Sequence, residues 1–133
     1  MNCECSTEIS GKTGKAVVIK VAMPPMSMNS AYGSGKYQNR RFLLSKGKTY
    51  KYNIQQACPK MLPLKGKLEA VFRFTFPTKR RCDTSNFVKL AEDALIGYVY
   101  EDDSQIYVHH LYKYYDKNNP SIEIVIKEIE DET

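Results

Sequence analysis

One segment of the chain, from Lys79 to Gln105, gathers most of the side chains suited to chemistry. It opens with three cations at 79–81, continues through an amphipathic stretch, and closes on three consecutive carboxylates at 101–103. Carboxylates brought close together repel one another unless a cation lies between them, and hard oxygen ligands suit Mg²⁺ or Mn²⁺. The segment therefore indicates a site for a divalent metal and for phosphate groups, with a solvated acidic turn as the alternative.

The positions of these charged residues suggest a separate role for each in binding a metal and phosphate groups. Asp83 stands at the start of the expected helix, whereas Asp102 and Asp103 follow its end. A metal held by such carboxylates polarises a phosphodiester and can activate water. Lys89, one turn into the helix, would stabilise the charge that develops in the transition state. The cations at 79–81 would hold the flanking phosphates.

The periodicity of apolar residues predicts the elements that must position these side chains. Residues 68–76 alternate between apolar and polar side chains, which is the pattern of a strand with one buried face. Residues 87–95 carry one apolar stripe at helical spacing, and this helix is expected to end near Gly97. Asn86, Lys89 and Asp93 lie together on its polar side.

Further strands are expected at 15–22, 105–115 and 121–127, and a further helix at 49–61. Turn-forming residues at 116–120 predict that the last two strands form a hairpin. If the strand at 105–115 lies beside the one at 68–76, the carboxylates converge. The order of elements predicts one α+β (mixed α/β) domain, in which a small, mostly antiparallel or mixed sheet of about four strands carries two main helices.

The two ends of the chain differ from this body in composition. Residues 1–14 are polar and predict a disordered arm, residues 15–127 the folded domain, and residues 128–133 an acidic tail. Neither a membrane span nor a signal peptide is apparent, so we expect a cytoplasmic protein. The four cysteines lack paired knuckles and are expected to be free thiols rather than zinc ligands.

The chain is basic, with a formal net charge of +5, although four carboxylates fall within residues 128–133. Such a balance suits a polyanionic partner such as nucleic acid, and a merely soluble basic protein is the alternative. Residues 23–41 mix cations with Tyr32 and Tyr37 and are expected to form an irregular loop. Such a loop can hold phosphates and stack on bases, and a solvated basic loop is the alternative. The expected nucleic-acid contacts are Lys36, Arg40, Arg41, Lys79, Arg80, Arg81 and Lys89.

Four separated motifs follow one another along the chain. They are Pro-Pro-x-Ser-x-Asn at 24–29, Lys-Thr-Tyr-Lys at 48–51, Asp-x-x-Asn-Phe-x-Lys-x-x-x-Asp-Ala-Leu at 83–95, and Glu-Asp-Asp-Ser-Gln-Ile at 101–106. In these residues and in their order the chain resembles the RusA family of Holliday-junction resolvases. The resemblance covers nearly the whole chain after the N-terminal arm.

The resemblance implies a homodimeric, Mg²⁺-dependent endonuclease of DNA recombination and repair, often encoded by prophages. Such enzymes cut two opposed strands of a four-way DNA junction symmetrically. By this pattern Asp83 matches the first catalytic aspartate, and Asp103, with Asp102 beside it, matches the distal pair. Lys89 matches the lysine that follows the asparagine. Asp83, Asp102 and Asp103 would then hold Mg²⁺ or Mn²⁺.

One position departs from the family pattern. Ser85 stands where the family has its second aspartate. Because a hydroxyl is a weak, uncharged ligand for Mg²⁺, another carboxylate would have to complete the site. Asp93, Glu101 and Glu92 are the candidates.

Three functions follow from these observations. The leading hypothesis is a metal-dependent endonuclease that resolves four-way DNA junctions. A second is a protein that binds junction DNA but has weakened or lost cleavage through Ser85. A third is a nuclease that acts on structured RNA, because no residue in the sequence specifies deoxyribose.

Overall fold

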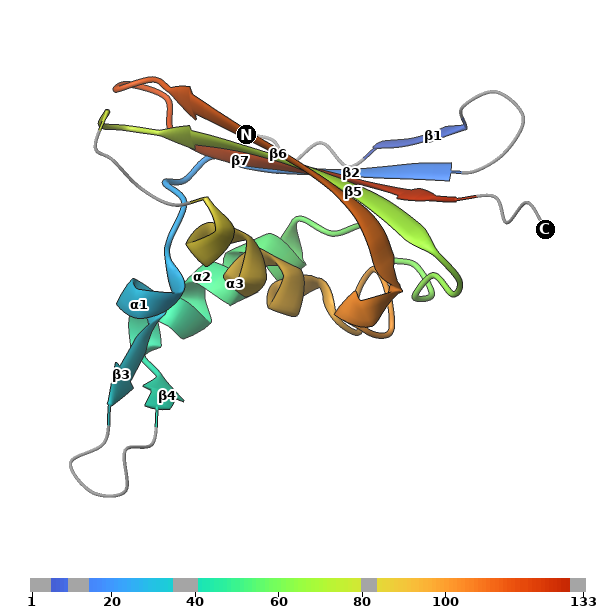
Figure 1. The fold of residues 1–133 in the computed structure, drawn as a ribbon, viewed down its shortest axis with the longest axis horizontal. Coiled ribbons are helices and arrows are strands. Elements are labelled where there is room, and N and C mark those ends of the chain that lie inside the picture. Colours follow the sequence, from blue (N-terminus) through green and yellow to red (C-terminus); the bar gives the residue numbers. More distant parts are fainter. Residues whose placement is uncertain (1–5, 10–14, 35–40, 80–83, 130–133) are drawn as a thin grey trace.

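A twisted five-stranded sheet carries helices on one face, and a small hairpin extends away from this body (Figure 1). The computed structural model describes residues 6–9, 15–34, 41–79 and 84–129. The strands are β1 (Ser6–Ile9), β2 (Lys15–Val21), β3 (Tyr32–Ser34), β4 (Arg41–Leu43), β5 (Leu68–Phe76), β6 (Ile106–Tyr115) and β7 (Ser121–Glu128). The helices are α1 (Met28–Ala31), α2 (Ser45–Gln56), α3 (Ser85–Leu95) and the 3₁₀ turn η1 (Asp103–Gln105).

The large sheet has the strand order β1-β2-β7-β5-β6. Its neighbours are antiparallel except for β5 and β6, which run parallel and are connected through α3. The α+β class and the mixed sheet are thus confirmed, and the strand at 106–115 does lie beside the one at 68–76, which was the condition for the carboxylates to converge. The sheet has one strand more than the expected four because Ser6–Ile9, within the segment predicted to be a disordered arm, pairs with β2.

The predicted hairpin between β6 and β7 is wrong, because β5 lies between them. Turn-forming residues at 116–120 indicate where the chain reverses but not which strand becomes the neighbour. The backbone amide of Asp116 donates to the carbonyl of Phe76 at 2.9 Å, so the connection passes over the end of β5. Placing β5 between two strands satisfies both of its edges while its apolar side chains are buried.

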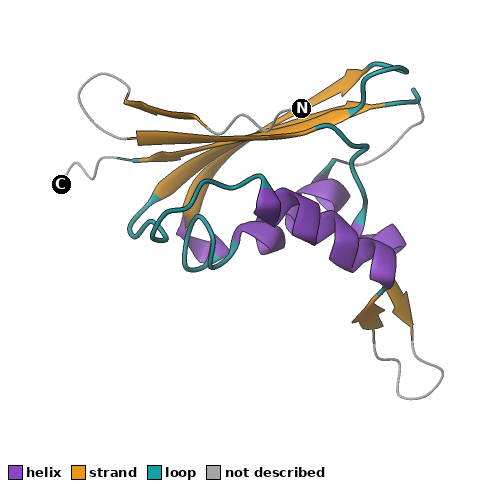
Figure 2. Ribbon diagram, turned by 180° about the vertical axis from the view of Figure 1, so that it is seen from behind, coloured by secondary structure: helices purple, strands orange, loops and turns teal. Residues whose placement is uncertain are grey.

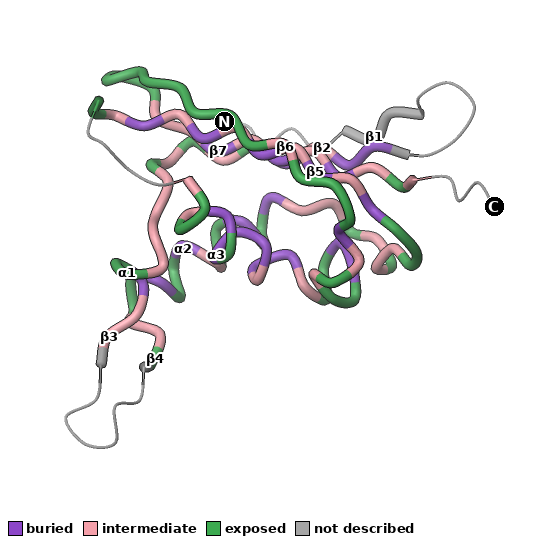
Figure 3. Tube along the Cα trace, viewed as in Figure 1, coloured by how far each residue is buried: buried purple, intermediate pink, exposed green. Residues whose placement is uncertain are grey.

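The core lies between the sheet and the helices (Figure 3). Every second residue of β5 from Leu68 to Phe76 is buried, as the alternating pattern predicts. The predicted stripe of α3 meets this face: Leu90, Ala91, Ala94 and Leu95 are fully buried. The helix ends at Leu95, and Gly97 adopts the expected left-handed conformation with φ of 86°.

Helix α2 begins at Ser45, four residues before the expected start at Thr49, and ends at Gln56 before Pro59. Its first turn is fixed by close packing rather than by helix propensity. A Cβ atom on Gly47 would lie 2.7 Å from Leu43 Cδ1 and 2.8 Å from the carbonyl oxygen of Ala31. Glycine therefore lets α2 approach α1 and β4 more closely than any other residue would allow.

The prediction that residues 23–41 form an irregular loop is wrong for much of the segment. Ser27 caps α1, since its hydroxyl accepts from the Ser30 amide at 3.2 Å. Strand β3 then pairs antiparallel with β4, with Tyr32 opposite Leu43. In Figures 1 and 2 this hairpin extends beyond the helical layer, away from the large sheet. Local capping and cross-strand pairing thus order a segment whose prolines and glycines indicated only irregularity.

Across the ranges that the structure describes, no helix is both long and apolar enough to span a membrane.

Candidate active site

Lys89 lies between two carboxylates that come from different parts of the chain. Its Nζ atom is 2.6 Å from Asp103 Oδ2 and 3.2 Å from Asp93 Oδ1. Lys89 and Asp93 are one turn apart on α3, whereas Asp103 begins η1. Both carboxylate side chains are only 22% exposed, so the ion pairs are partly shielded from water. The hydrogen bond to Asp103 raises the pKa of Lys89, which therefore stays charged at neutral pH.

The short turn η1 fixes the position of Asp103. Asp102 caps this turn, with its carboxylate accepting from the Ser104 amide at 3.1 Å. Gln105 completes a capping box, because its Oε1 accepts from the amides of Glu101 and Asp102 at 2.9 Å each. The Nε2 atom of Gln105 donates to the carbonyls of Leu64 and Gly66, which ties the turn to the chain entering β5. The turn therefore holds Asp103 against α3.

A buried tyrosine holds the connection between α3 and η1 in place. The hydroxyl of Tyr100 donates to the backbone carbonyl of Glu92 at 2.7 Å, and Tyr100 is fully buried. This hydrogen bond holds the turn that follows α3 against the helix. It therefore restrains the position of the chain just before the carboxylates at 101–103.

Beside this cluster, α3 and β6 are joined by a contact between Glu92 and His109. The Nε2 atom of His109 contacts Glu92 Oε2, and the ring stacks on Phe72 with 6.4 Å between centroids. Burial raises the pKa of Glu92, while the contact with His109 opposes that rise. On the opposite face of the sheet, His110 contacts Glu69 at 2.6 Å. The two histidines thus face opposite ways, as their adjacency in a strand predicts.

The structure brings together only some of the expected site residues. Lys89, Asp93 and Asp103 converge, whereas the carboxylate of Asp102 is engaged in the cap of η1. The carboxylate of Glu101 is directed to Lys65 instead, with 3.9 Å between Glu101 Oε2 and Lys65 Nζ. Several expected residues lie outside the described part of the chain: Lys36, Arg40, Arg80, Arg81 and Asp83. Arg41 lies in β4, but the position of its side chain is not described.

The donor chemistry of Asp93 and Asp103 fits a hard divalent ion. Mg²⁺ takes few protein carboxylates and keeps several of its waters, so two carboxylates form a sufficient core for such a site. Within the described residues, no three His, Cys, Asp or Glu side chains form a metal-binding group. A third protein ligand would therefore come from a residue such as Asp83, which lies outside the described ranges.

Among the described residues, three cations stack on tyrosines along β6. Lys67 lies over Tyr107, Arg73 over Tyr112 and Lys79 over Tyr115, at 5.2, 5.4 and 5.1 Å from the ring centroids. Of the cations expected to contact nucleic acid, Lys79 is thus held at the end of β5. Together these cations and rings give this edge of the sheet both positive charge and flat apolar surface.

Sequence analysis missed two features of the site. The capping box is readable from the Asp-x-x-Gln spacing between Asp102 and Gln105. The pair of Glu92 and His109 carries no such signal, because 17 residues separate its members and only the packing of α3 on β6 joins them.

A protein-family model described as endodeoxyribonuclease RusA matches residues 22–127 of the chain. This range contains every element from α1 to β6 and nearly all of β7. It therefore includes all the residues that surround Lys89. No curated protein matches the chain.

Proposed function

The chain belongs to the RusA family of endodeoxyribonucleases, and from that premise we propose that it is a metal-dependent enzyme that resolves four-way DNA junctions by paired, symmetric nicks. Its nuclease domain spans residues 15–127, and the ion is Mg²⁺ or Mn²⁺. The observation that carries the proposal is the convergence of Asp93 and Asp103 on the ammonium of Lys89.

Each of these side chains has a definite part in the proposed reaction. Asp93 and Asp103 supply carboxylate oxygens, and Asp83 is the expected third acidic ligand. A bound divalent ion polarises a phosphodiester and lowers the pKa of water. Lys89 holds its ammonium beside the carboxylates, where it would neutralise charge that develops on the phosphate oxygens. Phosphate that enters the site would replace one of the carboxylates as a partner of Lys89.

Asp93 is the carboxylate that takes over the ligand role left open by Ser85. It lies with Asp103 on Lys89, whereas Glu101 is directed to Lys65 and Glu92 contacts His109. Asp93 comes from the same helix as Ser85, two turns further along. A ligand displaced along the helix can thus reach the same ion from a position two turns further along.

Cleavage of a synthetic four-way junction in Mg²⁺ tests this assignment. Asp83→Asn, Asp93→Asn and Asp103→Asn should each lower the single-turnover rate by about 10²-fold or more. Glu101→Gln is the matched control, because it removes a neighbouring carboxylate that is directed elsewhere. Equal rates for wild type, Asp93→Asn and Asp103→Asn would overturn the site, and a loss in Glu101→Gln alone would move the ligand role to Glu101.

Branched DNA would lie across the projecting hairpin and the cations that follow β5. Lys79 is described at the end of β5, and the cations at 36, 40, 41, 80 and 81 are proposed contacts. Phosphate contacts of this kind make affinity fall with salt. Competition between a DNA junction and structured RNA separates this function from an RNA nuclease.

We further propose that β6 pairs two copies of the chain into a homodimer. It is an edge strand of ten residues, and it exposes large apolar side chains: Tyr107, Val108, Leu111, Tyr112, Tyr114 and Tyr115. A long, apolar edge strand left open invites pairing with another chain. A two-fold arrangement would also supply the two active sites that paired incision requires.

A second candidate function is junction binding with weak or no cleavage. It is favoured by the same contacts, because the ammonium of Lys89 offsets the negative charge of Asp93 and Asp103 that would bind a metal. In this case the protein binds junctions in a salt-sensitive way but cuts them in neither Mg²⁺ nor Mn²⁺. Restoring the family residue with Ser85→Asp should then raise cleavage, and no gain would exclude Ser85 as the cause.

A further inference from the structure

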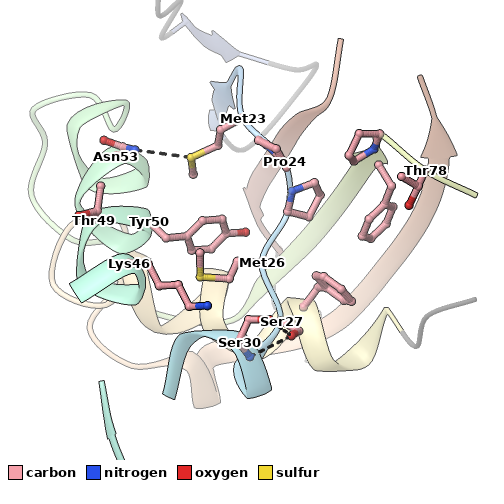
Figure 4. A pocket seen from close by; sticks show the side chains of 14 residues that line it. Met23, Pro24, Met26, Ser27, Ser30, Lys46, Thr49, Tyr50, Asn53 and Thr78 are labelled. Carbon is pink, nitrogen blue, oxygen red and sulfur yellow. Dashed lines mark hydrogen bonds between the residues drawn. The ribbon is translucent and has the colours of Figure 1, made fainter. Parts of the chain in front are cut away.

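A pocket of about 820 Å³ opens between the segment that precedes α1, helix α2, and the end of β5 (Figure 4). Its walls are largely apolar and include Met23, Pro24, Met26, Tyr50, Phe76 and Phe87. Polar side chains border it, among them Lys46, Thr49 and Asn53 of α2. A mostly apolar pocket with a few polar groups is the usual form of a site for a small organic group.

Two of the four motifs line this pocket, and the proposed cleavage chemistry uses neither of them. Pro24, Pro25 and Ser27 come from the Pro-Pro-x-Ser-x-Asn motif, and Thr49 and Tyr50 from Lys-Thr-Tyr-Lys. The two segments are about 25 residues apart in sequence but face each other across the pocket in Figure 4. The pocket thus gives them a common location.

The hydroxyl oxygen of Tyr50 lies near the backbone of Met26, but no acceptor for its proton is found among the described residues. Tyr50 is only 3% exposed, and its ring extends from α2 into the pocket (Figure 4). Burial raises the pKa of Tyr50, so the hydroxyl remains protonated and able to donate. Buried donors are nearly always paired in folded proteins, and a ligand acceptor would satisfy this one.

The remaining chemistry of the pocket suits a nucleobase. Phe76 and Phe87 meet edge to face, with 4.9 Å between their centroids, and both contribute apolar surface to the pocket wall. An unstacked base needs such surface for its π-face and a few polar groups for its edge. Asn53 carries an amide that can both donate and accept, and Lys46 places a positive charge where the phosphate of a nucleotide would emerge. An apolar peptide side chain would leave these groups unused.

We propose that this pocket holds one unstacked nucleobase of the branched DNA, taken from a nucleotide that adjoins the branch point. The proposal rests on the proposed function, because it takes junction DNA as the substrate. Phe87 and Lys89 lie two residues apart on α3. A base held against Phe87 would therefore fix the DNA relative to the helix that carries the catalytic lysine.

Filling the pocket tests the proposal. Thr49 is exposed on α2 and lines the pocket, so Thr49→Trp should block it without disturbing the core. The matched control is Gln56→Trp, which places the same side chain on an exposed position of the same helix that does not line the pocket. Each full-length variant is titrated, with Asp103→Asn added to prevent cleavage, against junctions that carry 2-aminopurine at one position next to the branch.

We expect one labelled position to change fluorescence strongly when wild type or Gln56→Trp binds, and Thr49→Trp to abolish that change. Junction affinity should fall by about tenfold in Thr49→Trp, the size of one lost base–aromatic stack, with affinity for plain duplex unchanged. Tyr50→Phe should change the melting temperature of the free protein little, since the hydroxyl has no acceptor there, and should weaken junction binding several-fold.

The outcomes separate this proposal from the function on which it rests. If wild type binds and cuts junctions while no position responds and Thr49→Trp binds equally well, the pocket proposal is overturned and the nuclease function stands. If wild type neither binds nor cuts junctions, the proposed function itself fails. A change in sedimentation of Thr49→Trp alone would assign the pocket to a second copy of the chain and would also overturn the proposal.

Discussion

A single ammonium group at Lys89 both holds two carboxylates together and competes with any other cation for them. Its ammonium lies within ion-pair distance of Asp93 and Asp103. Both carboxylates are partly shielded from water, which strengthens their attraction to the ammonium. Replacing it should therefore have opposite effects on two measurable quantities, the binding of metal and the rate of cleavage.

Lys89→Met keeps the length of the side chain and removes its charge. We expect the cleavage rate to fall by about 10²-fold, because positive charge is lost at the phosphate. Affinity for Mn²⁺, measured by calorimetry, should rise because Asp93 and Asp103 are no longer neutralised. Lys65→Met is the control, since Lys65 pairs only loosely with Glu101 at an exposed position. Weaker Mn²⁺ binding in Lys89→Met would contradict this account of the site.

Asp102 gives a test of the turn that presents Asp103. Hydrogen bonds from Ser104 lower the pKa of Asp102 below its ordinary value of 3.8. The folded state therefore favours the ionised form, and this stabilisation is complete above the ordinary aspartate pKa and lost as the pH falls through the lowered value. Asp102→Ala should be less stable than wild type in urea at pH 7, and the gap should narrow toward pH 2. A gap that does not change with pH would exclude the charged cap as its cause.

At the level of elements, the close approach of α2 to its neighbours depends on Gly47. In most helices Gly→Ala stabilises by about 1 kcal/mol. Here the added methyl would meet Leu43 and the carbonyl of Ala31, so Gly47→Ala should destabilise by about 1–3 kcal/mol instead. Chemical unfolding measures the difference, and Lys48→Ala, exposed on the same helix, serves as the control. A stabilised Gly47→Ala would show that the contact is relieved at little cost.

Some elements of the fold can be predicted from the sequence, and the pairing of the strands cannot. Strand β5 and helix α3 can be predicted because their patterns are local. Apolar and polar residues alternate along β5, and an apolar stripe runs along α3 and stops before Gly97. The strand that pairs with β6 cannot be predicted in this way, because whether β5 or β7 becomes its neighbour depends on how the whole sheet buries its apolar side chains.

The same distinction holds within the site. Lys89 and Asp93 are readable as neighbours because they are one helical turn apart. Which carboxylate joins them is decided by the direction in which η1 turns, since that turn brings Asp103 to Lys89 and leaves Glu101 facing Lys65. Such directions depend on long-range contacts, such as those of Gln105 with Leu64 and Gly66.

For the molecule as a whole, the proposed dimer through β6 has a direct test. Leu111 is 39% exposed on this edge strand, so Leu111→Lys should leave the fold intact and place like charges at the proposed interface. We expect the dimer dissociation constant, measured by sedimentation, to rise by about tenfold or more. Junctions should then be nicked on one strand rather than on two. Tyr52→Lys, on an exposed position of α2, is the control, and unchanged dimerisation of Leu111→Lys would exclude β6 as the interface.

The position of β7 has a consequence for how the chain reaches this fold. It is the last strand in sequence, yet it lies between β2 and β5 and buries Ile122, Ile124 and Ile126 completely. Until residues 121–128 have been synthesised, β2 and β5 have no strand to join them, and the core lacks these three isoleucines. Formation of the complete sheet therefore depends on contacts between distant parts of the chain, and such contacts form slowly.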